Sequence, residues 1–343
     1  MNGEKIMRRR PRAGAGAASV LLALGLFVAS AFAPVGARQQ VGEGWTATRH
    51  GVAGRDLNAV YFTDNKRGWM GGDGGLVYHT EDGGRTWVRQ IVATNDQVND
   101  LYFRDKEDGY LVAGSAVYLT ADGGRTWREG HRFGAADFGG ATELYSVRFA
   151  SRKKGWIVGS ISRRDVVTDS LVLYTDDGGA TWRRQLVPSR DELIHLDFAD
   201  DKRGWIAGAK GTILATADGG LNWTRQRTGT NATLYHVNFV DDERGWSVGE
   251  RGTILRTTNG GETWTPTAAP GLQPRTTFLS IGFAGKEQGW IVGRGGRILR
   301  SDDGGRSWVQ QESGTKQHLY ALFVGKKQNC AVGGDGMVLH YER

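Results

Sequence analysis

The chain has 343 residues and a formal net charge of +7, with 53 glycines, 12 tryptophans, six prolines and one cysteine. Five basic residues and one acidic residue fall within residues 1–37, so the rest of the chain carries a net charge of only +3. This small excess gives no argument for nucleic-acid binding, and a single cysteine excludes an internal disulfide. Many glycines with few prolines favour an all-β protein with tight turns.

The N-terminal segment has the pattern of a secretory signal peptide. Arginines cluster between residues 8 and 12, an uncharged apolar stretch runs from Ala17 to Ala33, and small residues follow up to Ala37. The apolar stretch is shorter than the ~20 residues that a membrane span needs, which disfavours an uncleaved anchor. We therefore expect cleavage after Ala37, export to a periplasm, a lumen or the exterior, and a single domain over residues 38–343.

An eight-residue segment, [Ser/Thr]-x-[Asp/Asn]-Gly-Gly-x-x-Trp, occurs six times. Its hydroxyl and acidic side chains can accept nearby backbone N–H groups and its glycines supply positive φ, so each copy predicts a hairpin turn. We expect its tryptophan to pack against the neighbouring sheet. The copies are Thr80–Trp87, Thr120–Trp127, Thr175–Trp182, Thr216–Trp223, Thr257–Trp264 and Ser301–Trp308.

The third position of this segment is interpreted as structural rather than catalytic. It is too regular to form one active site, and one copy has an asparagine, which hydrogen bonding tolerates and acid–base chemistry does not. These residues are Asp82, Asp122, Asp177, Asp218, Asn259 and Asp303.

Each copy lies inside a longer unit of four short strands. An apolar strand that usually ends in Phe comes first, a charged turn leads into a Gly-Trp strand, and a third strand runs into the eight-residue segment. Four strands in roughly 40–45 residues are typical of a β-propeller blade. The expected first strands are Leu57–Phe62, Val98–Phe103, Leu144–Phe149, Leu193–Phe198, Leu234–Phe239, Phe278–Phe283 and Leu319–Val324.

The two ends of the chain predict seven blades rather than six. Residues 319–340 contain the first three strands of a further unit, and Gly44–Arg49 resembles a fourth strand without its preceding turn. Pairing Gly44–Arg49 with Met337–His340 would close the ring and remove both open sheet edges. Cys330 takes the position that Trp holds in five other units, so we expect a buried structural thiol.

These repeats resemble known families. The eight-residue segment resembles the Asp-box, or bacterial neuraminidase repeat, of sialidases, xyloglucanases and sortilin-type receptors. The longer unit, clearest from Phe239 to Gly249 and on to Trp264, is similar to the photosystem II stability/assembly factor family. The similarity covers essentially all of the chain after residue 37. Members of that family are exported seven-bladed propellers, which in phototrophs escort reaction-centre subunits.

The resemblance implies a monomeric, non-enzymatic scaffold without cofactor, whose partner is a protein client such as a membrane-complex subunit. The alternative is a glycan-binding propeller or a glycoside hydrolase. We find no arginine triad and no Tyr–Glu pair of the sialidase kind, and a xyloglucanase places its carboxylates between two propellers. A glycan site would also need exposed aromatic residues, for which Phe133 and Phe138 are the few candidates. We assign no catalytic residue and no metal site.

Two regions are candidates for binding. The loops of the face that carries the blade-to-blade connections depart from the repeat at Gly130–Thr142 before the third unit, at Ser160–Ser170 within it, and at Thr267–Thr277, and irregular loops commonly carry recognition. Arginine suits carboxylate or peptide recognition. The arginines of the loops on this face are Arg132, Arg163, Arg164, Arg190 and Arg275.

The second candidate is the central channel. By period-two alternation, the third residue of each first strand faces the axis. His195 and His236 fall on adjacent blades, where a metal or a small anion is conceivable, although hydrated residues without a ligand are the simpler interpretation. The polar members of this column are Asp100, Ser146, His195, His236 and Ser280.

Overall fold

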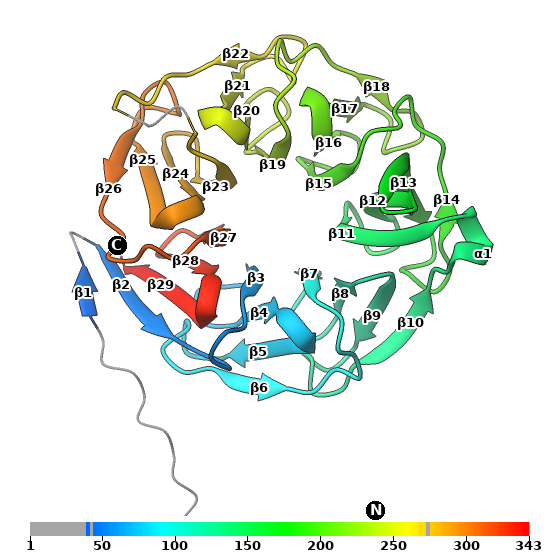
Figure 1. Ribbon diagram of the computed structural model, residues 1–343, viewed down its shortest axis with the longest axis horizontal. Coiled ribbons are helices and arrows are strands. Elements are labelled where there is room, and N and C mark those ends of the chain that lie inside the picture. The colour runs from blue at the N-terminus through cyan, green and yellow to red at the C-terminus, as the bar shows by residue number, and fades with distance from the viewer. Residues whose placement is uncertain (1–38, 42–43, 272–274, 343) are drawn as a thin grey trace, which may run out of the picture. The chain divides into compact units, whose positions relative to one another are not determined.

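The computed structural model describes residues 39–41, 44–271 and 275–342. The predicted signal segment, residues 1–37, lies outside these ranges. The described strands form seven antiparallel sheets around a central axis (Figure 1). The all-β, seven-bladed propeller is therefore confirmed. In this part of the chain no helix has the length and apolar character needed to cross a bilayer.

Each blade places four strands in order from the axis outward. The innermost strands are β3 (Leu57–Phe62), β7 (Val98–Phe103), β11 (Ala141–Phe149), β15 (Leu193–Phe198), β19 (Leu234–Phe239), β23 (Phe278–Ala284) and β27 (Leu319–Val324). The second strands are β4 (Gly68–Gly72), β8 (Gly109–Ala113), β12 (Gly155–Arg163), β16 (Gly204–Gly208), β20 (Gly245–Gly249), β24 (Gln288–Gly293) and β28 (Gln328–Gly333). The third strands are β5 (Leu76–Thr80), β9 (Ala116–Thr120), β13 (Val166–Thr175), β17 (Ile213–Thr216), β21 (Ile254–Thr257), β25 (Arg297–Ser301) and β29 (Met337–Glu342). The outer strands are β6 (Val88–Gln90), β10 (Arg128–Arg132), β14 (Arg183–Arg184), β18 (Thr224–Arg225), β22 (Thr265–Pro266), β26 (Val309–Gln311) and β2 (Trp45–Arg49).

The N-terminal strand closes the ring. β2 pairs antiparallel with β29, from Trp45 opposite Tyr341 to Arg49 opposite Met337, and β1 (Gln39–Val41) adds a fifth strand outside β2. The buried Trp45 also donates from Nε1 to Oε1 of Gln311 in the sixth blade, at 3.1 Å. The predicted closure of the seventh blade is confirmed, and it joins the two ends of the ring as one sheet.

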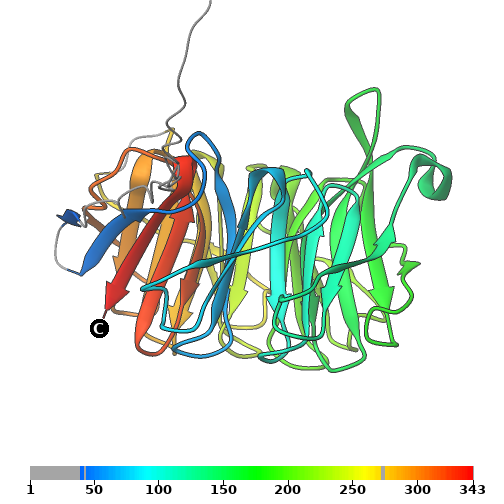
Figure 2. The same ribbon diagram turned by 90° about the horizontal axis from the view of Figure 1, so that it is seen from below.

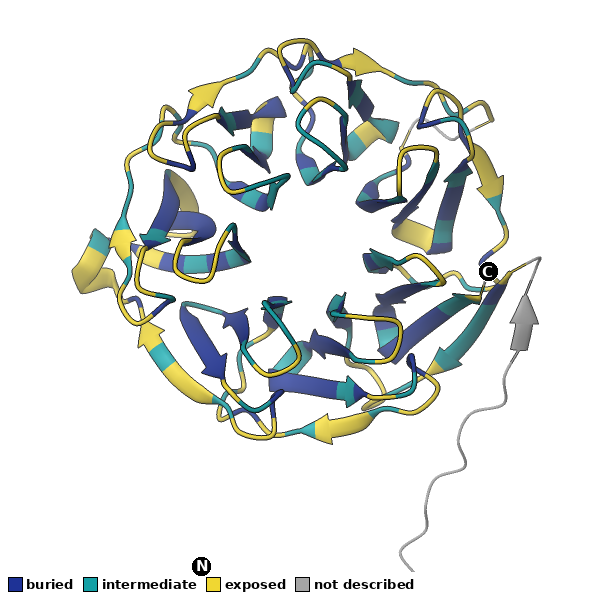
Figure 3. Cartoon of the chain, turned by 180° about the vertical axis from the view of Figure 1, so that it is seen from behind, coloured by how far each residue is buried: buried dark blue, intermediate teal, exposed yellow. Residues whose placement is uncertain are grey.

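The apolar core lies between adjacent blades, in seven clusters, while most outer strands and turns are exposed (Figure 3). In five of the seven blades a tryptophan of the second strand fills the seam. Trp205 stacks on Phe239 of the next blade with ring centroids 3.4 Å apart, and its Nε1 donates to the carbonyl of Gly260 at 2.9 Å. In the second blade Tyr110 takes this place, stacking on Phe149. One aromatic side chain thus supplies both apolar contact and a hydrogen bond across the seam.

The tryptophan that ends each Asp-box packs into the seam with the preceding blade, as expected. Trp127 meets Phe103 of its own blade edge-on, with centroids 5.9 Å apart. Its Nε1 donates to Oε1 of Gln90 in the preceding blade at 3.3 Å. Trp69 of the preceding blade stacks on the same Phe103, so this ring contacts two indoles in one seam.

The Asp-box turns are held by their own polar side chains. In the second blade Asp122 accepts hydrogen bonds from the hydroxyl and the backbone N–H of Thr126, at 2.6 and 2.9 Å. These bonds lower the pKa of Asp122 to about 2. The second glycine of the box is held by geometry as well: Gly220 has a φ of +75°, and a Cβ there would lie 2.4 Å from Trp156. The acidic and glycine positions therefore have a structural role in the turn.

The blade-to-blade connections and the turns between second and third strands share one face, which we call the loop face. Five of these turns are short 3₁₀ segments: η1 (Asp73–Gly75), η2 (Ala209–Gly211), η3 (Glu250–Gly252), η4 (Arg294–Gly296) and η5 (Gly334–Gly336). In the third blade β12 and β13 are longer, at nine and ten residues, and the short helix α1 (Ala135–Phe138) precedes β11. Figure 2 shows this hairpin and helix projecting beyond the rest of the loop face.

Candidate functional site

A hollow of about 310 Å³ lies on the axis where the innermost strands begin, toward the loop face. We call it the channel well. It opens between polar, aromatic and aliphatic side chains from all seven blades. Its lining residues are Asn58, Ala59, Val60, Gln97, Asn99, Asp100, Tyr145, Arg148, Ile194, His195, Tyr235, His236, Leu279, Ser280, Tyr320, Ala321 and Leu322.

A bulge at the start of every innermost strand shapes this lining. The pairing with the second strand shifts between the first and third residues, as between Leu193 and His195, and leaves the residue between them outside the ladder. In the longer β11 the equivalent shift lies between Leu144 and Ser146. A bulge turns two successive side chains toward the same side of the strand. Ile194 and His195 therefore both line the channel well, whereas strict alternation assigns only the third residue to the axis.

The predicted polar column divides into two parts. Asp100, His195, His236 and Ser280 line the channel well. Ser146 is buried beside them and donates its hydroxyl to Oδ2 of Asp100 at 2.7 Å. All five residues thus lie at the channel, and neighbouring blades are joined there by side-chain hydrogen bonds.

Arg148 organises the polar floor of the channel well. Its Nη1 donates to Oδ2 of Asp100 at 2.6 Å and to the carbonyl of Val147 at 2.7 Å. Its Nη2 lies 3.3 Å from Nε2 of His195. Sequence reasoning missed Arg148, although it is two residues beyond Ser146 and one further step of the same alternation places it on the axis.

His195 and His236 form a stacked pair, with ring centroids 3.7 Å apart and planes at 26°. Burial, then the neighbouring His236 and Arg148, hold the pKa of His195 well below its usual value. Burial, then Arg148, lowers the pKa of His236 to about 3. Both rings are therefore neutral at neutral pH. Because Arg148 donates to Nε2 of His195, the ring proton of His195 is assigned to Nδ1.

The Nδ1 atoms of both histidines are buried and have no hydrogen-bond partner among the described residues. A buried polar atom without a partner is uncommon and costly. The same part of the chain contains no group of three or more His, Cys, Asp or Glu side chains placed to hold a metal ion. The histidine pair therefore lines the channel well without the ligand set of a metal site.

Asp197 is a second buried acid that sequence reasoning missed. It occupies the position of Arg148 on the next blade and accepts backbone N–H groups from Phe239 at 2.8 Å and Phe198 at 3.0 Å. Burial raises its pKa to about 6 despite these hydrogen bonds and the nearby Arg148. The floor of the channel thus combines a cation, two acids and two neutral imidazoles.

A second hollow, of about 1000 Å³, lies on the loop face between the fourth and fifth blades. We call it the basic groove, because Lys210, Arg225, Arg227 and Arg251 line it. Asp191 pairs with two of them, Lys210 and Arg225, each at 3.1 Å. Sequence reasoning missed these four residues because they belong to loops of regular length. The only signal was that basic residues recur at η2, η3 and the connection between them.

The arginines of the irregular loops do not form one patch. Arg132 pairs with Asp96 at 3.2 Å and with Glu129 at 2.8 Å, so its charge is largely compensated. Arg163 uses its Nε to donate to the carbonyl of Gly139 at 2.8 Å, which ties the long hairpin to the end of α1. These two contacts are within the protein and stabilise the irregular loops.

The other three predicted arginines are spread over the loop face. Arg164 is at the tip of the long hairpin, with a φ of +50°. Arg190 is exposed and precedes Asp191 at the edge of the basic groove, and Arg275 is exposed in the connection that follows the fifth blade. Arg190 is therefore next in sequence to the acid that pairs with two cations of the basic groove.

The aromatic candidates for a glycan site are not exposed. Phe133 exposes only 4% of its surface, and Phe138 packs on it with ring centroids 5.9 Å apart. The scarcity of exposed aromatic residues that disfavours a glycan site therefore extends to these two candidates, because the insertion folds back on itself, burying Phe133 and half-burying Phe138.

Comparisons with known proteins agree with this architecture. The model of the family described as "Photosynthesis system II assembly factor YCF48" matches residues 87–187, 180–228 and 222–318. A solved structure titled "YCF48 bound to D1 peptide" has a TM-score of 0.70 at 19% identity, covering 89% of this chain and 100% of that one. YCF48 from Cyanidioschyzon merolae has a TM-score of 0.69 at 20% identity, covering 87% and 98%.

Enzymes with propeller domains are similar as well. The GH74 enzyme of Niastella koreensis has a TM-score of 0.64 at 13% identity, covering 88% of this chain and 53% of that one. At these identities the solved structures share the fold alone. No curated protein sequence gives a significant match.

Proposed function

The chain belongs to the family of the photosynthesis system II assembly factor YCF48, and we propose that it is a non-enzymatic scaffold that holds a segment of a client protein during assembly. The observation that carries the proposal is the basic groove. Its volume of about 1000 Å³ is at the upper end of ligand sites and leaves room for an extended peptide segment. A YCF48 protein has been solved with a D1 peptide.

The charges of the basic groove favour an acidic client segment. Four cations face one acid, Asp191, so the groove keeps a net positive charge. Arg227 has no ion-pair partner among the described residues, and Arg251 contacts only the neutral amide of Asn231, at 2.6 Å. Guanidinium groups in such a position suit the paired oxygens of Asp, Glu or a chain terminus.

The hydrogen bonding of the channel supports the non-enzymatic part of the proposal. Oδ2 of Asp100 accepts three hydrogen bonds, from Ser146, Val147 and Arg148. A carboxylate occupied in this way is poorly placed to exchange a proton with a substrate. The carboxylate of Asp100 and the guanidinium of Arg148 thus compensate each other's charge.

The place of action is part of the same proposal. Residues 1–37 have the pattern of an export signal, so the propeller would act outside the cytoplasm. We propose that it acts there as a monomer. A client there would be a membrane-complex subunit whose exposed segment reaches the loop face. The rival function, glycan binding or hydrolysis, rests on the fold that this chain shares with GH74 enzymes.

A binding experiment tests the proposal. A fluorescently labelled extended peptide rich in Asp and Glu is titrated with the protein lacking residues 1–37, and its anisotropy is measured. Reversing two groove charges, Arg227→Glu with Arg251→Glu, should abolish binding. The matched control, Arg89→Glu with Arg125→Glu, changes net charge equally at exposed sites away from the groove.

Three outcomes would contradict the proposal. Equal loss of binding in both variants would mean that net charge alone attracts the peptide. Absence of binding to the wild-type protein would remove the groove as a peptide site. Turnover of a glycoside that disappears when one loop-face carboxylate is replaced would favour the hydrolase instead.

A further inference from the structure

A ring of carboxylates surrounds the mouth of the channel well. In five blades the bulged second residue of the innermost strand, which lines the channel well, donates a hydrogen bond to an acidic side chain of the loop face. The pairs are Asn58 with Asp73 at 3.1 Å, Asn99 with Glu143 at 2.8 Å, Tyr145 with Glu192 at 2.6 Å, Tyr235 with Glu250 at 3.2 Å, and Tyr320 with Asp56 at 2.9 Å. We call these five acids the acidic rim.

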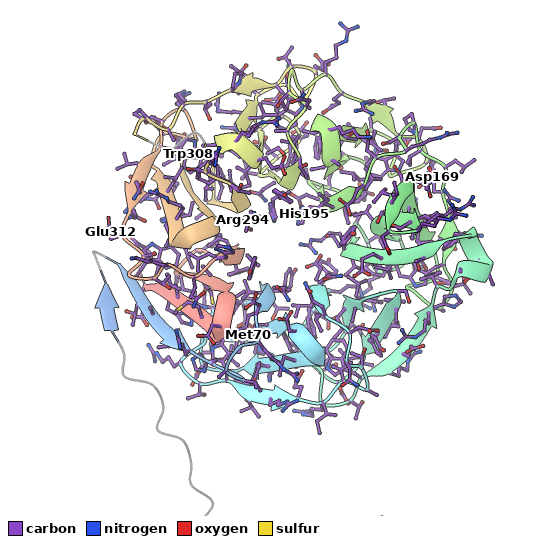
Figure 4. The ribbon with its side chains drawn as sticks, in the orientation of Figure 1. Met70, Asp169, His195, Arg294, Trp308 and Glu312 are labelled. Atoms are coloured by element: carbon purple, nitrogen blue, oxygen red, sulfur yellow. The ribbon has the colours of Figure 1, made fainter. Side chains whose placement is uncertain are left out.

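The acidic rim is not neutralised within the described part of the chain. None of its five carboxylates makes an ion pair there, and all five are half-buried. Burial, then the negative charges of Asp96 and Glu192, raises the pKa of Glu143. Arg294 also lies by the central opening (Figure 4), as the cation that faces the rim tyrosines Tyr235 and Tyr320. The mouth of the channel well therefore keeps a strong negative charge.

The floor of the channel well gives an independent sign of a ligand. His195 exposes only 9% of its surface, lines the hollow, and has an Nδ1 without a hydrogen-bond partner among the described residues. The Nδ1 of the stacked His236 also has no hydrogen-bond partner among the described residues. A neutral imidazole whose tautomer no neighbour fixes, as in His236, can accept a proton-bearing group or donate to an oxygen. The charge of Arg148, in contrast, is already compensated by Asp100.

The shape and chemistry of the walls favour an organic cation. Tyr145, Tyr235 and Tyr320 line the channel well together with Ile194 and Leu279. Aromatic faces attract ammonium and guanidinium groups, and apolar walls accept the methylene stem of a long side chain. A carboxylate ring around a recessed hollow raises the local concentration of cations and repels anions. The small anion considered for the histidine pair is therefore disfavoured.

We infer that the channel well receives a lysine or arginine side chain of the client segment. This inference rests on the proposed function for the identity of the ligand as a protein segment. The turn η3 joins the two sites, because Glu250 belongs to the acidic rim and the next residue, Arg251, lines the basic groove. A client segment whose acidic residues bind in the basic groove can therefore place a neighbouring basic side chain over the channel well.

The test uses small probes that need no client. N-acetyl-lysine methylamide and N-acetyl-arginine methylamide are titrated into the protein, and the imidazole signals of His195 and His236 are followed by NMR. The neutral analogue N-acetyl-citrulline methylamide is the matched probe control. Saturable shifts with the two cations and none with citrulline are expected, because the rim carboxylates select charge.

Variants of the acidic rim then locate the site. Glu192→Gln and Glu250→Gln each keep an oxygen that accepts the tyrosine hydroxyl, so the fold is retained while one charge is lost. Each should weaken binding of the cationic probes by about tenfold. Glu243→Gln and Glu287→Gln remove the same charge from exposed turns on the opposite face and should leave the affinity within twofold, roughly.

The outcomes separate this inference from the proposed function. Absence of histidine shifts with either cation, or equal weakening by the rim and control variants, would overturn the channel well as a cation site. Binding of the acidic peptide in the basic groove without any response to lysine or arginine would retain the proposed function and reject the inference. The reverse result would retain the cation site and reject the groove. Thermal unfolding of each variant checks that the fold is intact; if one rim variant unfolds, Glu143→Gln replaces it.

Discussion

The seams between blades and the central channel are built from the same repeat, yet equivalent positions hold similar residues at the seams and different residues around the channel. At the seams, five of seven second strands place a buried tryptophan at the same position. Around the axis, the seven equivalent third residues are Ala59, Asp100, Ser146, His195, His236, Ser280 and Ala321. Close packing between blades favours a large aromatic side chain at the seam position, whereas the open channel imposes no such requirement. The residue type can therefore vary around the axis without loss of the fold.

The largest effect should come from a seam. Trp205→Ala removes an indole that is 98% buried, its stacking on Phe239 and its hydrogen bond to Gly260. We expect a loss of about 3–5 kcal/mol in the free energy of unfolding, which urea titration measures. Cys330 occupies the same position in the seventh blade, and Cys330→Ala should cost clearly less because a smaller volume is removed. Equal losses would contradict the view that indole packing dominates the seams.

The channel should show its effect in the pH dependence of stability. The pKa of Asp197 is raised to about 6 in the folded protein, against 3.8 as its usual value. The folded state therefore binds this proton more tightly, and the resulting stabilisation is complete below about pH 4 and lost as the pH rises through 6.

Asp197→Asn should remove that dependence. Between pH 4 and pH 8, the free energy of unfolding of the wild-type protein should fall by about 3 kcal/mol relative to the variant. Urea titrations of both proteins across this range measure the difference, in which the other titrating groups, including His195 and His236, cancel. Parallel curves for the two proteins would show that folding does not raise the pKa of Asp197.

A substitution in the Asp-box should change the free energy of unfolding less, and this stabilisation should be lost toward low pH rather than toward high pH. Asp122→Ala removes hydrogen bonds to Thr126 and Thr120, and we expect a loss of about 1 kcal/mol at neutral pH. Because the folded pKa of Asp122 is lowered to about 2, its contribution is present above pH 4 and lost as the pH falls toward 2. The variant and the wild-type protein should thus converge in acid, which thermal unfolding at a series of pH values tests.

The smallest change in the free energy of unfolding should come from replacing the asparagine of the fifth Asp-box by the aspartate that the other boxes have. In the fifth blade Asn259 accepts the N–H of Thr263 at 3.0 Å and donates its amide to the Thr263 hydroxyl. Asn259→Asp reverses the second bond, as in the other boxes, and should change the free energy of unfolding by less than about 0.5 kcal/mol at pH 7. A larger change would mean that the boxes are not interchangeable turns.

Much of the fold was predictable because it depends on local and repeated signals. Turn residues at constant spacing located the boxes, and the incomplete units at the two ends required β2 to complete the seventh blade. The polar column of the channel followed from alternation, although the bulge at each second residue changed which side chains line the hollow. The packing of Phe133 on Phe138 was not predictable, because a loop sequence does not show how the loop folds back on itself.

The sequence by itself thus determined the blade count, the closure of the ring and the polar character of the axis, since each follows from the repeat and its period. Only the tertiary structure decided that Arg148 joins Asp100 to His195, that five carboxylates encircle the mouth, and that four cations of η2, η3 and the connection between them form one groove. The physical reason is that these groups come from different blades, at least 40 residues apart for Asp100, Arg148 and His195. Their contacts depend on the curvature of the closed ring and on the bulges, which no local pattern encodes.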